Sequence, residues 1–270
     1  MKEALAVYFG FAEDTRPQVT YLSWQQLTYV TAMVVAALII GIVLGRRSRK
    51  KPFEKRITSL KVMSVVMVAC ELLKIAVICL RVHDISQARS LYPLFLCSIM
   101  LFALSIAAFA KGRLQKAALD FSIKFGFLCM VAGTYPAANM FPSQLLKFEL
   151  NVSTVTHCLS GMGAAYIASA GLVSMEKRNR GISYAILVGF EILALAADLW
   201  QRNSAYQSNY MFFMQSDGTP FIMYENFCGG TGPLYTILAF LTYPAYLLLF
   251  DTVYSLIKKR PGRRKKEAAA

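Results

Sequence analysis

The chain has 270 residues, of which 56% are hydrophobic and only 16% are charged, and its mean hydropathy is +0.46. A soluble domain carries about a quarter charged residues, so this composition argues against a water-soluble globular fold and is typical of a membrane protein with several spans. The formal net charge is +14. The basic residues gather between the apolar runs, which favours contact with a membrane surface and predicts no nucleic-acid partner.

Seven apolar runs are long enough to cross a hydrocarbon core of about 30 Å as helices. They predict an all-α fold, a polytopic seven-transmembrane-helix bundle that forms a single membrane domain over residues 1–257. A basic tail follows at 258–270. The predicted helices cover about 22–44, 60–80, 90–110, 117–138, 150–173, 182–200 and 233–257.

Lysine and arginine are distributed unevenly between the two sets of connecting segments. Twenty-one lie after the first, third and fifth predicted helices and in the tail, whereas six lie in the N-terminal segment and the remaining connections. The positive-inside rule then predicts an N-terminus outside the cell and a cytoplasmic C-terminus. We expect the basic face to meet anionic headgroups of the cell membrane.

The third predicted helix carries a thiol near its outer end. Cys97 lies eight residues after Arg89, about 12 Å below the expected entrance of the helix. His157 lies eight residues after Glu149 on the fifth helix, so we expect the two side chains at the same depth. A nearby imidazole can remove the thiol proton, and the thiolate can then attack a carbonyl to give an acyl-enzyme. The alternative is that Cys97 only packs and that His157 joins two helices by a hydrogen bond.

Small and polar residues surround His157 on one face of the fifth predicted helix. They stand three and four residues before and after it: Ser153, Thr154, Ser160 and Gly161. A polar face is costly in lipid, so we expect this stripe to face the interior of the bundle. Within and just after the connection over 201–232, the stretches Ser208–Phe221 and Gly229–Tyr235 are apolar and aromatic for an exposed loop. We expect this loop to cover the outer mouth of the bundle, where its amides and Asn209 could stabilise an oxyanion.

Other intramembrane charges favour a different function. Glu71 and Lys74 stand three residues apart on the second helix, and Glu191 and Asp198 share a face of the sixth. Lys74 needs compensation from one of these carboxylates, and together they are compatible with a transporter or channel-like protein. A non-catalytic membrane scaffold is a further alternative. The chain has two histidines and no cysteine pair at metal-ligand spacing, so no metal and no cofactor are predicted.

Motifs along nearly the whole chain resemble the YwaF family of bacterial seven-helix membrane proteins. They are Tyr8-Phe-Gly-Phe11, Glu71-Leu-Leu-Lys74, Tyr92-Pro-Leu-Phe-Leu-Cys97-Ser98, His157, Asn209-Tyr-Met211, Gly218-Thr-Pro-Phe221 and Gly232-Pro-Leu-Tyr235. That family is similar in turn to eukaryotic membrane acyltransferases with a Cys–His pair and, more distantly, to androgen-induced lipid hydrolases with a Thr–His pair.

The resemblance implies Cys97 as a nucleophile and His157 as a general base. It implies an acyltransferase or hydrolase of the bacterial plasma membrane that acts on a phospholipid or another lipid ester. The oligomeric state is left open. The chain departs from the family at Phe95, where His is usual, and at Thr156, where Ser is usual. The residues expected to support the catalytic pair are Glu71, Lys74, Ser98, Thr154, Asn209 and Tyr210.

Overall fold

The structure, a computed structural model, describes residues 2–16, 22–135, 147–205 and 207–267. It divides into two compact units, Met1–Met211 and Phe212–Ala270. The described residues form helices and no strand, which confirms the all-α prediction. The single membrane domain over 1–257 stays a prediction.

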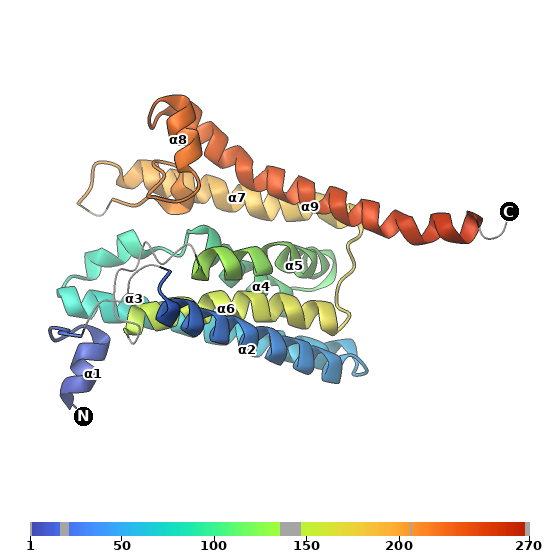
Figure 1. The fold of residues 1–270 in the computed structure, drawn as a ribbon, viewed down its shortest axis with the longest axis horizontal. Coiled ribbons are helices and arrows are strands. Elements are labelled where there is room, and N and C mark those ends of the chain that lie inside the picture. The colour runs from blue at the N-terminus through green and yellow to red at the C-terminus, as the bar shows by residue number, and fades with distance from the viewer. Residues whose placement is uncertain (1, 17–21, 136–146, 206, 268–270) are drawn as a thin grey trace. The chain divides into compact units, whose positions relative to one another are not determined.

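The first unit holds seven α-helices and two 3₁₀ turns among its described residues (Figure 1). Their bounds are α1 Lys2–Phe9, α2 Trp24–Ser48, α3 Phe53–Val82, η1 Ile85–Leu91, η2 Leu96–Ser98, α4 Ile99–Phe109, α5 Gly112–Thr134, α6 Phe148–Ser169 and α7 Lys177–Gln201. A third 3₁₀ turn, η4 Tyr210–Phe212, stands at the junction of the two units. The second unit holds α8 Ile222–Cys228 and α9 Pro233–Glu267.

Five helices are long and apolar enough to cross a membrane: α2, α3, α5, α7 and the Pro233–Ile257 part of α9. A bent pair, Ile85–Leu91 with Leu96–Phe109, adds a sixth candidate if it counts as one span. The chain is therefore an integral membrane protein with several apolar helices. The predicted count of seven spans is not confirmed.

The predicted continuous helix over 90–110 is wrong. The chain turns by 89° between η1 and the helical segment that follows it. Pro93 explains the break, because a proline ring disfavours helical angles in the preceding residue, and Tyr92 is extended with φ −55° and ψ 137°. Phe95 is extended as well, with φ −71° and ψ 157°. Cys97 therefore lies on a short turn at the N-terminus of α4, and its expected depth along a continuous helix no longer holds.

Several other boundaries differ from the predictions: α3 begins seven residues earlier, at Phe53, and α7 begins five residues earlier, at Lys177. α5 begins at Gly112, five residues earlier than predicted, and residues 136–138 at its predicted end lie outside the described residues. α9 continues beyond the apolar run into the predicted basic tail and ends at Glu267. Each of these two helices is longer than predicted at the end that carries basic residues, the N-terminus of α5 and the C-terminus of α9. Hydropathy alone therefore placed these two ends too close to the apolar run.

α6 is the central helix of the first unit and contacts α2, α3, α4 and α5 (Figure 1). It is not among the helices that are apolar enough to span a membrane by themselves. Its polar and small residues are tolerated because neighbouring helices cover them. Glycines allow this close packing: a Cβ on Gly41 of α2 would lie 2.6 Å from the Met162 carbonyl oxygen, and one on Gly126 of α5 would lie 2.6 Å from the Ser160 carbonyl oxygen.

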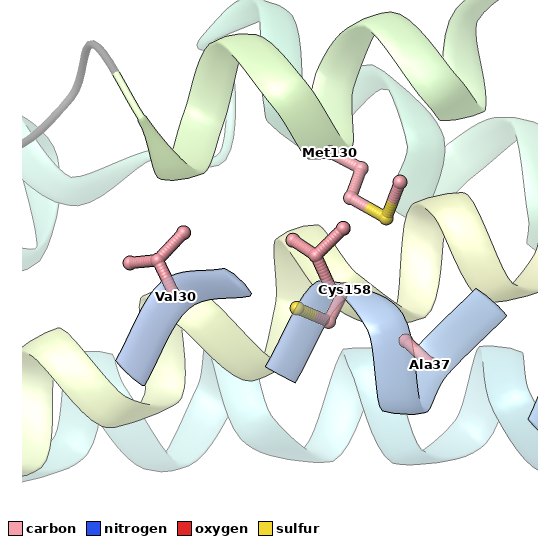
Figure 2. Close-up of a cluster of buried hydrophobic side chains, with 5 residues drawn as sticks. Val30, Ala37, Met130 and Cys158 are labelled. Atoms are coloured by element: carbon pink, nitrogen blue, oxygen red, sulfur yellow. The ribbon is translucent and has the colours of Figure 1, made fainter. Parts of the chain in front are cut away.

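A buried apolar cluster fixes the rotation of α6 beside His157. Figure 2 shows Val30 and Ala37 of α2 and Met130 of α5 around Cys158 of α6. Each of these four side chains is at most 7% exposed. Because Cys158 is the next residue after His157, its position in this cluster decides which way the imidazole points.

Three basic segments meet at one end of the first unit, which we call the basic end: Arg46–Arg56, Lys111–Lys116 and Glu176–Arg180. Arg56 donates to the carbonyls of Ala170 and Gly171 at 3.0 and 3.3 Å, and Arg113 donates to the Arg178 carbonyl. The opposite end, which holds Cys97, is called the thiol end. This arrangement agrees with the charge alternation along the chain, and the orientation in the membrane stays a prediction.

Candidate functional site

The two side chains predicted to be catalytic lie together at the thiol end. The Cys97 thiol and the His157 imidazole lie close enough to interact electrostatically. Cys97 is partly buried on η2, and His157 is 6% exposed on α6. The chain brings Cys97 toward His157 through the bend at Pro93, and the catalytic pairing stays a prediction.

The orientation of the imidazole is set by its own helix. Nδ1 of His157 lies 2.7 Å from the Ser153 carbonyl oxygen and 3.4 Å from the Ser153 hydroxyl. A carbonyl oxygen can only accept, so Nδ1 carries the proton in the neutral ring. Nε2 then keeps its lone pair and is the nitrogen available to accept the Cys97 proton. A general base requires this tautomer.

Gly133 of α5 makes room for the ring. A Cβ at this position would lie 1.8 Å from Cδ2 and 2.1 Å from Nε2 of His157, so the imidazole rests directly on the α5 backbone. Sequence reasoning missed Gly133. The available signal was its spacing of seven residues from Gly126, because two turns put both glycines on the face of α5 that meets α6.

An ion pair on α3 adds charge to the site. The Lys74 ammonium lies 2.8 Å from both carboxylate oxygens of Glu71, which confirms the predicted compensation. Glu71 is 7% exposed, and the Lys74 side chain is 23% exposed. The Lys74 charge acts on both Cys97 and His157. An ammonium in this position stabilises negative charge on the sulfur.

A second thiol holds the turn that carries Cys97. Cys129 of α5 donates to the carbonyl oxygen of Leu96 at 3.5 Å and is 1% exposed. The sequence placed Cys129 in an apolar run, and no local pattern indicated this contact. It attaches η2 to α5 immediately before Cys97.

The other residues predicted to support the catalytic pair differ in the contacts that they make. Ser98 is the N-cap residue of α4 without a side-chain cap bond, and the Thr154 hydroxyl donates to Leu150 of its own helix at 2.8 Å. Tyr210 bonds the backbone of the segment before Cys97, at Tyr92. Asn209 is half-buried in the preceding loop. Its expected oxyanion role and the expected lid over 201–232 stay predictions.

Two carboxylates of α7 are fully buried. Glu191 and Asp198 are both 0% exposed, and neither Glu191 oxygen has a hydrogen-bond partner in the described part of the chain. Within that part, no group of three or more His, Cys, Asp or Glu side chains could hold a metal ion.

Comparison with known proteins identifies a family and nothing narrower. The model of the TMEM164 family matches residues 21–257. No curated protein and no solved structure matches the chain. The relationship to the YwaF family stays a prediction.

Proposed function

Because the chain belongs to the TMEM164 family and is an integral membrane protein, we propose that it transfers or hydrolyses the acyl group of a lipid ester. Cys97 is the nucleophile and His157 is the general base. The observation that carries the proposal is the proximity of the Cys97 thiol to the His157 ring, whose Nδ1 lies 2.7 Å from the Ser153 carbonyl oxygen. A phospholipid or another lipid ester fits because its ester carbonyls lie near the headgroup boundary.

The first half-reaction forms an acyl-enzyme. Sγ of Cys97 attacks the ester carbonyl carbon while its proton moves to Nε2 of His157. The new C–S bond replaces the ester C–O bond, and the imidazolium returns the proton to the departing alkoxide. In the second half-reaction, a lipid hydroxyl or water gives its proton to Nε2 as its oxygen attacks the thioester carbonyl carbon. The C–S bond then breaks, and the imidazolium returns the proton to the Cys97 sulfur. A lipid hydroxyl as the acceptor gives acyl transfer, and water as the acceptor gives hydrolysis.

Two electrostatic features support this chemistry. Lys74, held by Glu71, places a positive charge within reach of Cys97. Cys97 also directly precedes α4, and the N-terminus of a helix favours negative charge nearby.

The proposal includes the finer topology. Counting α6 and the bent segment with the five apolar helices gives seven spans, with the N-terminus outside and the C-terminus in the cytoplasm. The meeting of three basic segments at one end supports this orientation. The proposed location is the bacterial plasma membrane.

One observation favours a second candidate function. Glu191 is 0% exposed and both of its oxygens are without a hydrogen-bond partner in the described residues, which is typical of a group that binds a proton or cation in a transporter.

One comparison separates the two functions. Purified protein is incubated in detergent with a phospholipid and a lysophospholipid to follow acyl exchange, and is reconstituted in liposomes to follow proton and cation flux. We expect exchange or fatty-acid release that Cys97→Ala abolishes and Cys158→Ala preserves, because Cys158 packs in the apolar cluster. Flux without exchange, unaffected by Cys97→Ala and lost in Glu191→Gln, would favour the transporter.

A further inference from the structure

The segment that leads to Cys97 cannot hold itself in place. Tyr92 and Phe95 are extended and the chain between them is not helical, so its amides and carbonyls lack the bonds of a helix. The one internal bond at its start is Leu94 N–H to the Tyr92 carbonyl, at 2.7 Å. Because Cys97 is two residues beyond Phe95, the position of the sulfur depends on what holds this segment from outside.

Tyr210 provides that contact from far along the chain. Its hydroxyl accepts from the Tyr92 N–H at 3.0 Å and donates to the Arg89 carbonyl at 3.0 Å. Its ring packs edge-on against Phe95, with centroids 5.1 Å apart. Burial raises the pKa of Tyr210 to about 12, so the hydroxyl keeps the proton that it donates at neutral pH. One side chain therefore contacts the segment at both of its ends.

Asp198 and Gln201 hold this arrangement on α7. Oδ1 of Asp198 accepts from the Tyr210 N–H at 2.8 Å and from the Ser208 hydroxyl at 2.9 Å. The Gln201 amide donates to the Arg89 carbonyl at 2.8 Å. Met211, the next residue after Tyr210, has φ +54°, a strained angle that persists only where surrounding contacts impose it.

We propose that Tyr210, held by Asp198, is a positioning residue that keeps the Cys97 thiol within hydrogen-bond reach of His157. The inference rests on the proposed function, in which this pair reacts. It assigns a role to the Asn209-Tyr-Met211 motif, whose tyrosine contacts the segment before the nucleophile and does not itself touch the sulfur.

The test uses Tyr210→Phe, which removes only the hydroxyl. Tyr166→Phe is the matched control, because the buried Tyr166 hydroxyl donates to the Arg56 carbonyl at 2.6 Å at the basic end. The full-length protein in detergent is treated with iodoacetamide, and alkylation of Cys97 is followed by peptide mass spectrometry as a function of pH. The titratable groups that act on Cys97 are His157, Lys74, Glu71 and Cys129, and neither variant removes any of them.

We expect Tyr210→Phe to lower the alkylation rate of Cys97 by roughly tenfold, the scale of one lost hydrogen bond. Its pH profile should become that of His157→Ala, and adding Tyr210→Phe to His157→Ala should change nothing further, because both act through the same contact. Tyr166→Phe should match the wild type. If Tyr210→Phe does not fold in detergent, Gln201→Met gives the same comparison with a smaller change.

Two results overturn the inference in distinguishable ways. The positioning role alone is rejected if the pH profile of Cys97 alkylation matches the wild type in Tyr210→Phe but changes in His157→Ala. It is also rejected if the effects of the two substitutions on the alkylation rate add in the double variant. An unchanged profile for His157→Ala rejects the Cys–His pair of the proposed function, and the positioning role with it.

Discussion

Two buried aspartates at opposite ends of the first unit hold turns of the chain in different ways. Asp120, 1% exposed at the basic end, accepts four hydrogen bonds of 2.8 to 3.0 Å, shared equally between its two oxygens. The donors lie between α6 and the first turn of α7: Ser174 N–H and hydroxyl, Met175 N–H and the Asn179 amide. Asp198, 0% exposed at the thiol end, uses Oδ1 for two bonds, and Oδ2 has no partner in the described residues.

The difference lies in how completely the two carboxylates are hydrogen-bonded. At the basic end every oxygen of the buried carboxylate is satisfied, as expected where the only requirement is a stable connection. At the thiol end one oxygen of Asp198 stays unpaired and the helix is broken at Pro93, whereas each of the two turns holds a methionine at positive φ, Met175 at +45° and Met211 at +54°.

The largest expected loss of stability follows the replacement of Asp120. Asp120→Ala leaves four donors without their acceptor and should lower the free energy of unfolding by about 3–5 kcal/mol. Asp198→Ala removes two bonds and one unpaired oxygen, and should cost about 1–2 kcal/mol. Thermal unfolding in detergent measures both. A larger loss for Asp198→Ala would contradict the comparison.

Gly133→Ala should damage the site more than the fold. The added methyl group would occupy the position of the His157 ring, and a displacement of about 1 Å can cost 100-fold in rate. The rate of Cys97 acylation measures the effect. Gly189→Ala on α7 is the control, because its Cβ would meet nothing within 4 Å. Equal acylation in the two variants would show that the ring position is unimportant.

Lys74→Met should have the smallest of these effects, a loss of about tenfold in Cys97 acylation, since it removes one charge near the sulfur and leaves the Cys97–His157 contact in place. Arg81→Met is the control from the same helix. Arg81 pairs with Glu149 at the thiol end and is not among the charges that act on Cys97. If both variants lose activity equally, the effect comes from folding and not from the site.

The sequence predicted the features that leave a local or compositional pattern. Apolar runs predicted the helices, and the three-residue spacing predicted the Glu71–Lys74 pair. The bend was missed because the apolar run hid the effect of Pro93 on its neighbour.

Contacts between distant parts of the chain could not be predicted. The Tyr210 hydroxyl and the Tyr92 N–H are 118 residues apart, and the packing of Gly133 on His157 depends on how α5 crosses α6. Nothing in the local sequence sets these distances, because tertiary packing decides them.

The most direct test of the central claim is to look for the acyl group on Cys97 itself. The wild type and His157→Ala are incubated with a phospholipid that carries an isotope-labelled acyl chain, quenched in acid and analysed as peptides by mass spectrometry. We predict a hydroxylamine-sensitive thioester on Cys97 in the wild type, much slower labelling in His157→Ala and no labelling of Cys129 or Cys158. An acyl group on another residue, or turnover of the lipid by Cys97→Ala, would contradict the account.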